Sequence, residues 1–280
     1  MESMKSMQTL CQMYDYSRVP VGLNFIGQFI KNTDHVLDAG CGTGNYIQKL
    51  APFVKNITGI DSNEDVLQWA KSKMSGMENV NLLQCSLNSR LQFENGTFDV
   101  ILVNQVLQYL DVDQENYPNI RFLLAELRRV LKPGGYILIN TCSKAMVDGY
   151  WYINLSPNCR EIFMKEYIAL DKLAEFMIEA GYNPTIQGQN ILEPLQGMKY
   201  FNLLGPIDII WKFGSNLEYG NMDGIRQSLS TLLNEGRLGQ YFDENDKYRR
   251  ENGQTIYIVG RNVDDVPSTP SASTNEPKVI

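Results

Sequence analysis

The sequence predicts an α/β fold, a doubly wound parallel sheet with helices on both faces, and three observations favour it. Short apolar segments of strand character alternate with segments of helical period. A glycine-rich turn at residues 40–44 follows the first of these strands. The 280 residues, 43% of them apolar, are enough to bury a sizeable core.

Seven segments have strand character, at residues 36–38, 57–61, 80–84, 98–104, 136–141, 185–191 and 255–260. The turn Lys132-Pro133-Gly134-Gly135 opens the fifth, because proline fixes one φ and the glycines permit positive φ. Apolar residues at three- and four-residue spacing predict helices over 66–73, 120–131 and 170–180. The pattern therefore predicts a seven-stranded sheet.

The connection between the sixth and seventh strands is too long for a simple loop. It covers about residues 195–253 and has helical spacing at 225–233, so we expect a helical insertion over the active-site edge. Residues 262–280 are rich in Pro, Ser, Thr and acids, and their low apolar content predicts a disordered tail. The main domain is expected at 34–261, after an N-terminal segment at 1–33.

Composition narrows the class of protein. The net charge of −7 argues against a general electrostatic hold on nucleic acid, which needs clustered Lys and Arg. No segment approaches the roughly 20 apolar residues of a membrane span, and residues 1–10 lack the apolar core of a signal peptide. Five scattered cysteines and one histidine, His35, predict no metal site. We expect a cytoplasmic protein.

The most informative motif is the turn Asp38-Ala39-Gly40-Cys41-Gly42-Thr43-Gly44. At a strand-to-helix turn, glycines let the backbone approach a ligand and expose amides at a helix N-terminus. An NAD site would need glycine at the position of Asn45. The alternating glycines after Asp38 resemble motif I of the class I S-adenosylmethionine-dependent methyltransferases instead.

Further segments resemble the same family in the same order. Gly59-Ile60-Asp61-Ser62 resembles its second-strand motif, whose acid accepts hydrogen bonds from the ribose hydroxyls of the cofactor. Residues 91–99 resemble the segment that enters strand four, and residues 127–135 the turn into strand five. The resemblance covers about residues 34–141 and implies a Rossmann-like sheet that binds S-adenosyl-L-methionine. The alternative for Asp61 is a cap on the following helix.

The resemblance implies a set of cofactor-binding residues, namely Tyr14, Arg18, Asp38, Gly40, Gly42, Gly44, Asp61, Ser62, Ser86, Leu87 and Asn104. Tyr14 and Arg18 belong to a segment similar to a lid in small-molecule members, where they would close over the methionine end of the cofactor. An amphipathic helix that packs on the domain is the alternative. Ser86 or Asn88 stands where many relatives carry an adenine-binding Asp.

The acceptor is expected at the end of strand four, near Asn104 and Gln105. Relatives of the ubiquinone or menaquinone C-methyltransferase type often carry His after this strand, where this chain has Gln108 and Tyr109, so no catalytic base is assigned. For the aromatic segment Tyr150-Trp151-Tyr152 we expect one of two roles. It either lines an acceptor pocket or belongs to the core.

The resemblance implies in-line transfer of a methyl group to a small-molecule acceptor, with no nucleic-acid or membrane partner. Two alternatives stay open. One is a protein or RNA methyltransferase. The other is a catalytically silent cofactor-binding or regulatory protein.

Overall fold

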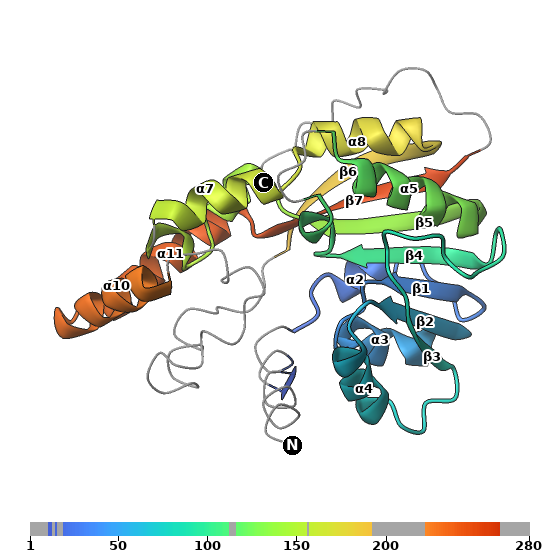
Figure 1. Cartoon of the computed structure of the whole chain (residues 1–280), viewed down its shortest axis with the longest axis horizontal. Helices are drawn as coiled ribbons and strands as arrows, with labels where there is room; N and C mark the ends of the chain where they lie inside the picture. Colours follow the sequence, from blue (N-terminus) through green and yellow to red (C-terminus); the bar gives the residue numbers. More distant parts are fainter. Residues whose placement is uncertain are drawn as a thin grey trace, which may run out of the picture.

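The computed structural model describes residues 11, 12, 15, 19–111, 116–155, 157–191 and 222–263. The strands of this part are β1 (His35–Ala39), β2 (Asn56–Asp61), β3 (Val80–Gln84), β4 (Phe98–Asn104), β5 (Leu131–Thr141), β6 (Tyr182–Ile191) and β7 (Thr255–Asn262). They form one sheet in the order β3-β2-β1-β4-β5-β7-β6 (Figure 1). Strands β1 to β5 are parallel, whereas β7 pairs antiparallel with both β5 and β6. The predicted seven-stranded sheet is confirmed.

Strand β5 begins five residues earlier than predicted, which is the largest difference among the strands. Leu131 pairs with Phe98, and Tyr136 pairs with Val100, so the predicted turn at residues 132–135 is a bulge inside β5. Gly134 has a φ of +77°, which the glycine there permits. The turn was therefore predicted at the right residues, but it interrupts β5 instead of preceding it.

The helices of the described residues are α2 (Leu23–Ile26), α3 (Asn45–Leu50), α4 (Glu64–Lys73), α5 (Pro118–Val130), α6 (Lys144–Val147), α7 (Pro157–Glu166), α8 (Leu170–Glu179), α10 (Met222–Asn234) and α11 (Leu238–Asn252). Asn63 caps α4, since its side chain accepts a hydrogen bond from the Val66 amide at 3.2 Å. Pro118 begins α5, where a missing amide hydrogen costs nothing. None of the described helices is long and apolar enough to cross a membrane.

The two faces of the sheet bury alternate residues of each strand. Leu37 and its neighbours pack with Leu127 of α5 and Phe176 of α8. On the opposite face, Val36 packs with Ile47 of α3 and with Leu67 of α4. The central parallel strands are therefore covered on both faces, as expected for this fold class, whereas the edge strand β3 is largely exposed.

A third apolar cluster joins α7, α10 and α11 beyond the sheet (Figure 1). It buries Trp151, Phe163, Leu229 and Phe242. Trp151 is therefore part of this core, as one of the two interpretations of residues 150–152 expected. Residues 192–221, within which the predicted insertion begins, and most of the predicted tail lie outside the described residues. The domain boundaries stay predictions.

The chain crosses from β3 to β4 through residues 85–97 without a helix, and Arg129 of α5 holds this loop. The guanidinium donates to the carbonyls of Leu91 at 3.0 Å and Phe93 at 2.8 Å. It also pairs at 2.6 Å with Glu126, whose carboxylate accepts a hydrogen bond from the Leu91 amide at 2.7 Å. Arg129 thus supplies the contacts that a covering helix would otherwise make.

We expect Arg129→Met to lower the free energy of unfolding by about 3 kcal/mol, because it leaves the largely buried Glu126 carboxylate without its cation. Urea unfolding measures this loss. The matched control is Arg121→Met on the same helix, whose ion pair with Glu179 is about half exposed, with side-chain exposures of 48% and 50%. That variant should lose at most about 1 kcal/mol. Equal losses would contradict the special role of Arg129.

Candidate functional site

The glycine-rich loop joins β1 to α3, and Gly40, Gly42 and Gly44 all have positive φ, at +81°, +52° and +75°. A Cβ at Gly40 would lie 2.5 Å from the Val106 side chain, and one at Gly44 would lie 2.1 Å from the methyl carbon of Met74. A Cβ at Gly42 would meet nothing within 4 Å. Packing against Val106 therefore requires glycine at position 40, and the positive φ favours it at position 44, where the flexible end of Met74 could move aside. Gly42 faces open space where a ligand can approach the backbone.

Asp61 ends β2 beside this loop and stabilises it. Its Oδ2 accepts a hydrogen bond from the Gly42 amide at 2.9 Å, and its Oδ1 accepts one from the Asn63 amide at 3.0 Å. The carboxylate therefore fixes the turn before α4 and lies next to Gly42, but the cap of that helix is Asn63 and not Asp61. Because a carboxylate has about four acceptor positions, it can receive two further donors.

Asp38 ends β1 and is 1% exposed. Its Oδ1 accepts a hydrogen bond from the Asn104 side-chain amide at 3.5 Å. The pKa of Asp38 is raised to about 7. Burial is the main cause, the hydrogen bond from Asn104 acts against it, and the nearby Asp61 carboxylate adds to it. At neutral pH the side chain therefore divides between its protonated and charged forms.

A cavity lies at the carboxyl ends of β1, β4 and β5, and its lining is Val19, Pro20, Val21, Asp38, Gly40, Cys41, Gly42, Thr43, Asn45, Tyr46, Asn104, Gln105 and Asn140. Residues 19–21 form one wall. The Val21 amide donates to the Tyr46 hydroxyl at 3.2 Å, and the Tyr257 hydroxyl donates to the Val21 carbonyl at 3.4 Å. The Thr43 hydroxyl is buried and has no hydrogen-bond partner among the described residues. The cavity thus offers a polar atom that a ligand could satisfy.

Gln105, directly after β4, has a φ of +54°, which is uncommon for a residue other than glycine. Its side-chain amide donates to Asn140 Oδ1 at 2.7 Å and accepts from the Tyr167 hydroxyl at 3.4 Å. Burial raises the pKa of the Tyr150 and Tyr167 hydroxyls well above their usual range, so both stay protonated at neutral pH. Backbone strain of the kind found at Gln105 concentrates at functional sites.

Four of the predicted cofactor residues, Asp38, Gly40, Gly42 and Asn104, line the cavity together. Val19 and Pro20 end the segment that resembles a lid, whereas sequence reasoning missed Val21, Tyr46 and Asn140. Tyr46 carried no signal beyond its place after the glycines, and Asn140 lies inside a strand that otherwise looked like core.

Of the other predicted residues that the structure describes, none lines this cavity; they are Gly44, Asp61, Ser62, Ser86 and Leu87. Ser62 is exposed, and its carbonyl accepts a hydrogen bond from Gln84 at 3.0 Å. The Ser86 hydroxyl accepts from the Asn88 amide at 3.2 Å, and Leu87 is 8% exposed in the core. Their roles in cofactor binding stay predictions. Tyr14 and Arg18 lie outside the described residues.

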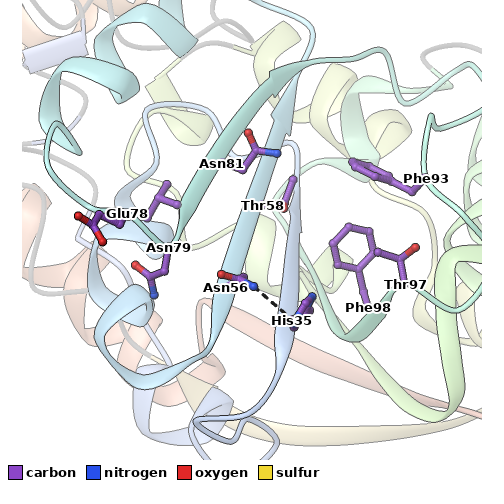
Figure 2. A pocket seen from close by; sticks show the side chains of 10 residues that line it. His35, Asn56, Thr58, Glu78, Asn79, Asn81, Phe93, Thr97 and Phe98 are labelled. Atoms are coloured by element: carbon purple, nitrogen blue, oxygen red, sulfur yellow. Dashed lines mark hydrogen bonds between the residues drawn. The ribbon is translucent and has the colours of Figure 1, made fainter.

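A second hollow, of about 260 Å³, lies at the opposite end of the strands (Figure 2). His35, Asn56 and Phe98 begin β1, β2 and β4, and all three line it. The ring Nε2 of His35 and the side-chain amide of Asn56 lie 3.3 Å apart. His35 is therefore at the far edge of the sheet from Asp38, as its place before the first strand predicted.

Comparison with known families gives a match over most of the domain. The family model described as a methyltransferase domain matches residues 30–195. A demethylmenaquinone methyltransferase of Lactococcus lactis is 32% identical over 154 residues, which are 50% of this chain and 58% of the relative. One of Staphylococcus aureus is 34% identical over 112 residues, 39% of this chain and 43% of the relative. The chain thus spans about half the length of these curated relatives.

Solved structures share the fold at low sequence identity. The YcgJ protein of Bacillus subtilis has a TM-score of 0.54 and 17% identity, and the match covers 87% of this chain and 98% of that one. The [4+2]-cyclase SpnF has a TM-score of 0.51 and 17% identity, covering 86% and 80%. Because one of these proteins is described as a cyclase, the fold by itself does not identify the reaction.

Proposed function

This chain belongs to the family of class I S-adenosylmethionine-dependent methyltransferase domains, and we propose that it transfers the methyl group of that cofactor to a small-molecule acceptor. The observation that supports a compact acceptor is the wall of residues 19–21, which Tyr46 and Tyr257 hold against the carboxyl ends of the strands. A wall of this kind encloses a small ligand, whereas a macromolecular acceptor needs an open approach.

The residues present fit the cofactor. Gly42 leaves its backbone open, Asp61 has spare acceptor positions, and the buried Thr43 hydroxyl has no partner among the described residues. We expect the loop, Asp61 and Asp38 to hold S-adenosylmethionine, which supplies a methyl group activated on a sulfonium. A carboxylate that can ionise near neutral pH suits a ligand with positive charge.

The contribution of the protein is alignment and the exclusion of water. Asn104 and Gln105 are fixed at the end of β4 by Tyr257 and Asn140, and alignment of two reactants contributes several kcal/mol to a displacement. Tyr150 and Tyr167 stay protonated and do not serve as bases at neutral pH. An acceptor whose nucleophile already has a free lone pair, such as a neutral amine or a thiolate, would need no base from these two tyrosines.

The test has two stages. Calorimetric titration with S-adenosylmethionine and S-adenosylhomocysteine, with NAD as the control, measures cofactor binding. Cofactor with a labelled methyl group is then incubated with the protein and a cell extract. Label in molecules that pass an ultrafiltration membrane supports a small acceptor. Label only in retained protein or RNA contradicts it, and a folded protein that binds neither compound contradicts the cofactor assignment.

We expect Gly42→Ala to weaken binding of S-adenosylhomocysteine by about tenfold, since its methyl group enters the open space beside the loop. The matched control is Gly76→Ala, at a glycine that also has positive φ, +90°, and nothing within 4 Å of a Cβ. Both variants should lose about 1–2 kcal/mol of stability through backbone strain. Equal affinities in the two variants would show that Gly42 does not face the cofactor.

A further inference from the structure

The ammonium group of Lys73, in the last turn of α4, joins three parts of the chain. It donates to the Thr43 carbonyl at 2.9 Å, to Asn45 Oδ1 at 2.7 Å and to Asp15 Oδ2 at 2.7 Å. These contacts use all three of its N–H donors. The Lys73 side chain is 14% exposed, whereas that of Lys71, two residues earlier, is 47% exposed.

Two of these contacts lie in the glycine-rich loop. Thr43 and Asn45 flank Gly44, whose φ is +75°, so Lys73 holds the backbone carbonyl before a left-handed residue and the side chain after it. Thr43 also lines the cavity, whereas Lys73 does not. Lys73 therefore acts on the cavity through the loop.

The third contact attaches the N-terminal segment to α4. Asp15 Oδ2 accepts a hydrogen bond from the Trp69 indole at 2.8 Å in addition to the ion pair with Lys73. The other oxygen, Oδ1, is buried and has no partner among the described residues. A carboxylate so placed depends on Lys73, its one cation in the part of the chain that the structure describes, because a buried charge without a counterion is costly. Docking of Asp15 therefore requires Lys73 in the position that also fixes the loop.

We propose that Lys73 is a positioning residue that couples docking of the N-terminal segment at Asp15 to the conformation of the glycine-rich loop. The segment that forms the wall at residues 19–21 then also sets the loop that holds the cofactor. The effect on cofactor affinity rests on the proposed function, whereas the effect on the loop does not.

The first experiment needs no ligand. Hydrogen–deuterium exchange of the whole chain is measured for the peptide that spans residues 40–45 in the wild type, in Asp15→Asn and in Lys71→Met. Asp15 reaches this loop through Lys73, so faster exchange there in Asp15→Asn, with no change in Lys71→Met, supports the coupling. Unchanged loop exchange in Asp15→Asn overturns it, whatever the protein binds.

The second experiment is a double-mutant cycle on the dissociation constant for S-adenosylhomocysteine. We expect a loss of about tenfold in Lys73→Met and a several-fold loss in Asp15→Asn. The double variant should lose little more affinity than Lys73→Met alone, because both changes break the same ion pair. Lys71→Met should stay within about twofold of the wild type.

The outcomes separate the two proposals. Multiplicative losses in the double variant would mean that the two residues act independently and would overturn the coupling. A wild-type protein that is folded and binds neither S-adenosylmethionine nor S-adenosylhomocysteine would overturn the proposed function, and loop exchange would then decide the coupling alone. If Lys73→Met does not fold, Asp15→Asn with its exchange readout still tests the inference.

Discussion

Replacing Asp61 with Ala is expected to weaken the affinity for S-adenosylmethionine by about 10- to 150-fold, or about 1.5–3 kcal/mol. The variant removes a charge-assisted acceptor for the ribose hydroxyls. It also removes the acceptor of the Gly42 and Asn63 amides, so the loop beside the cofactor loses its support. Calorimetric titration measures the affinity, and unchanged affinity in a folded variant would reject this role for Asp61.

Two further variants separate the expected contact of Asp61 with the cofactor from its support of the loop. Asp61→Asn keeps one oxygen that can accept from the Gly42 amide, so it should retain more stability than Asp61→Ala while still losing affinity. Asp65→Asn removes a negative charge from an exposed position in the first turn of α4 and serves as the control for net charge. Its affinity should stay within about twofold of the wild type.

Asp38 should give the stability of the protein an unusual dependence on pH. Its pKa is about 7 in the folded chain and about 3.9 in an unfolded one. Between these values the unfolded chain releases the proton and the folded chain keeps it. The free energy of unfolding should therefore fall by up to about 4 kcal/mol as the pH rises from about 4 to 7, and stay level above that.

The variant Asp38→Asn isolates this effect, because it cannot ionise and keeps an oxygen for the Asn104 amide. Other carboxylates act in the opposite direction: Lys132 and the His35 amide lower the pKa of Asp99, and Arg129 lowers that of Glu126. The informative quantity is therefore the difference in unfolding free energy between wild type and variant, measured in urea from pH 4 to 8. A difference that stays constant over this range would show that Asp38 ionises normally.

The central strands were predictable because burial on both faces makes each of them a short apolar segment bounded by turn residues. Helix α7 was not predicted, and α11 was expected only as an undefined part of the helical insertion over about residues 195–253. The composition of the two helices explains why. Helix α11 is mostly polar and charged, with few apolar positions to show a helical period. Helix α7 is similar and begins at a proline. Both are stabilised by the cluster around Trp151 and Phe242, which the sequence does not reveal.

The site was predictable where it is local in sequence. The end of one strand and the turn after it hold Asp38, Gly40 and Gly42. These residues lie near Asn104 because parallel strands end at the same edge of the sheet. The walls of the cavity could not be predicted, because they come from segments that are distant in the sequence. Tyr257 and Val21, for example, are 236 residues apart. Lys73 looked like an ordinary solvated residue at a helix end, and only its tertiary contacts set it apart.

The position of β7 has a consequence for the order of events during synthesis. This strand is translated after all the others, yet it lies between β5 and β6 and is the neighbour through which β6 joins the sheet. It also carries Tyr257, which holds the wall of the cavity at Val21. A nascent chain on the ribosome therefore has an open sheet edge and an incomplete cavity until β7 emerges. The wall at Val21 therefore gains its support from Tyr257 only after the last strand of the sheet has been made.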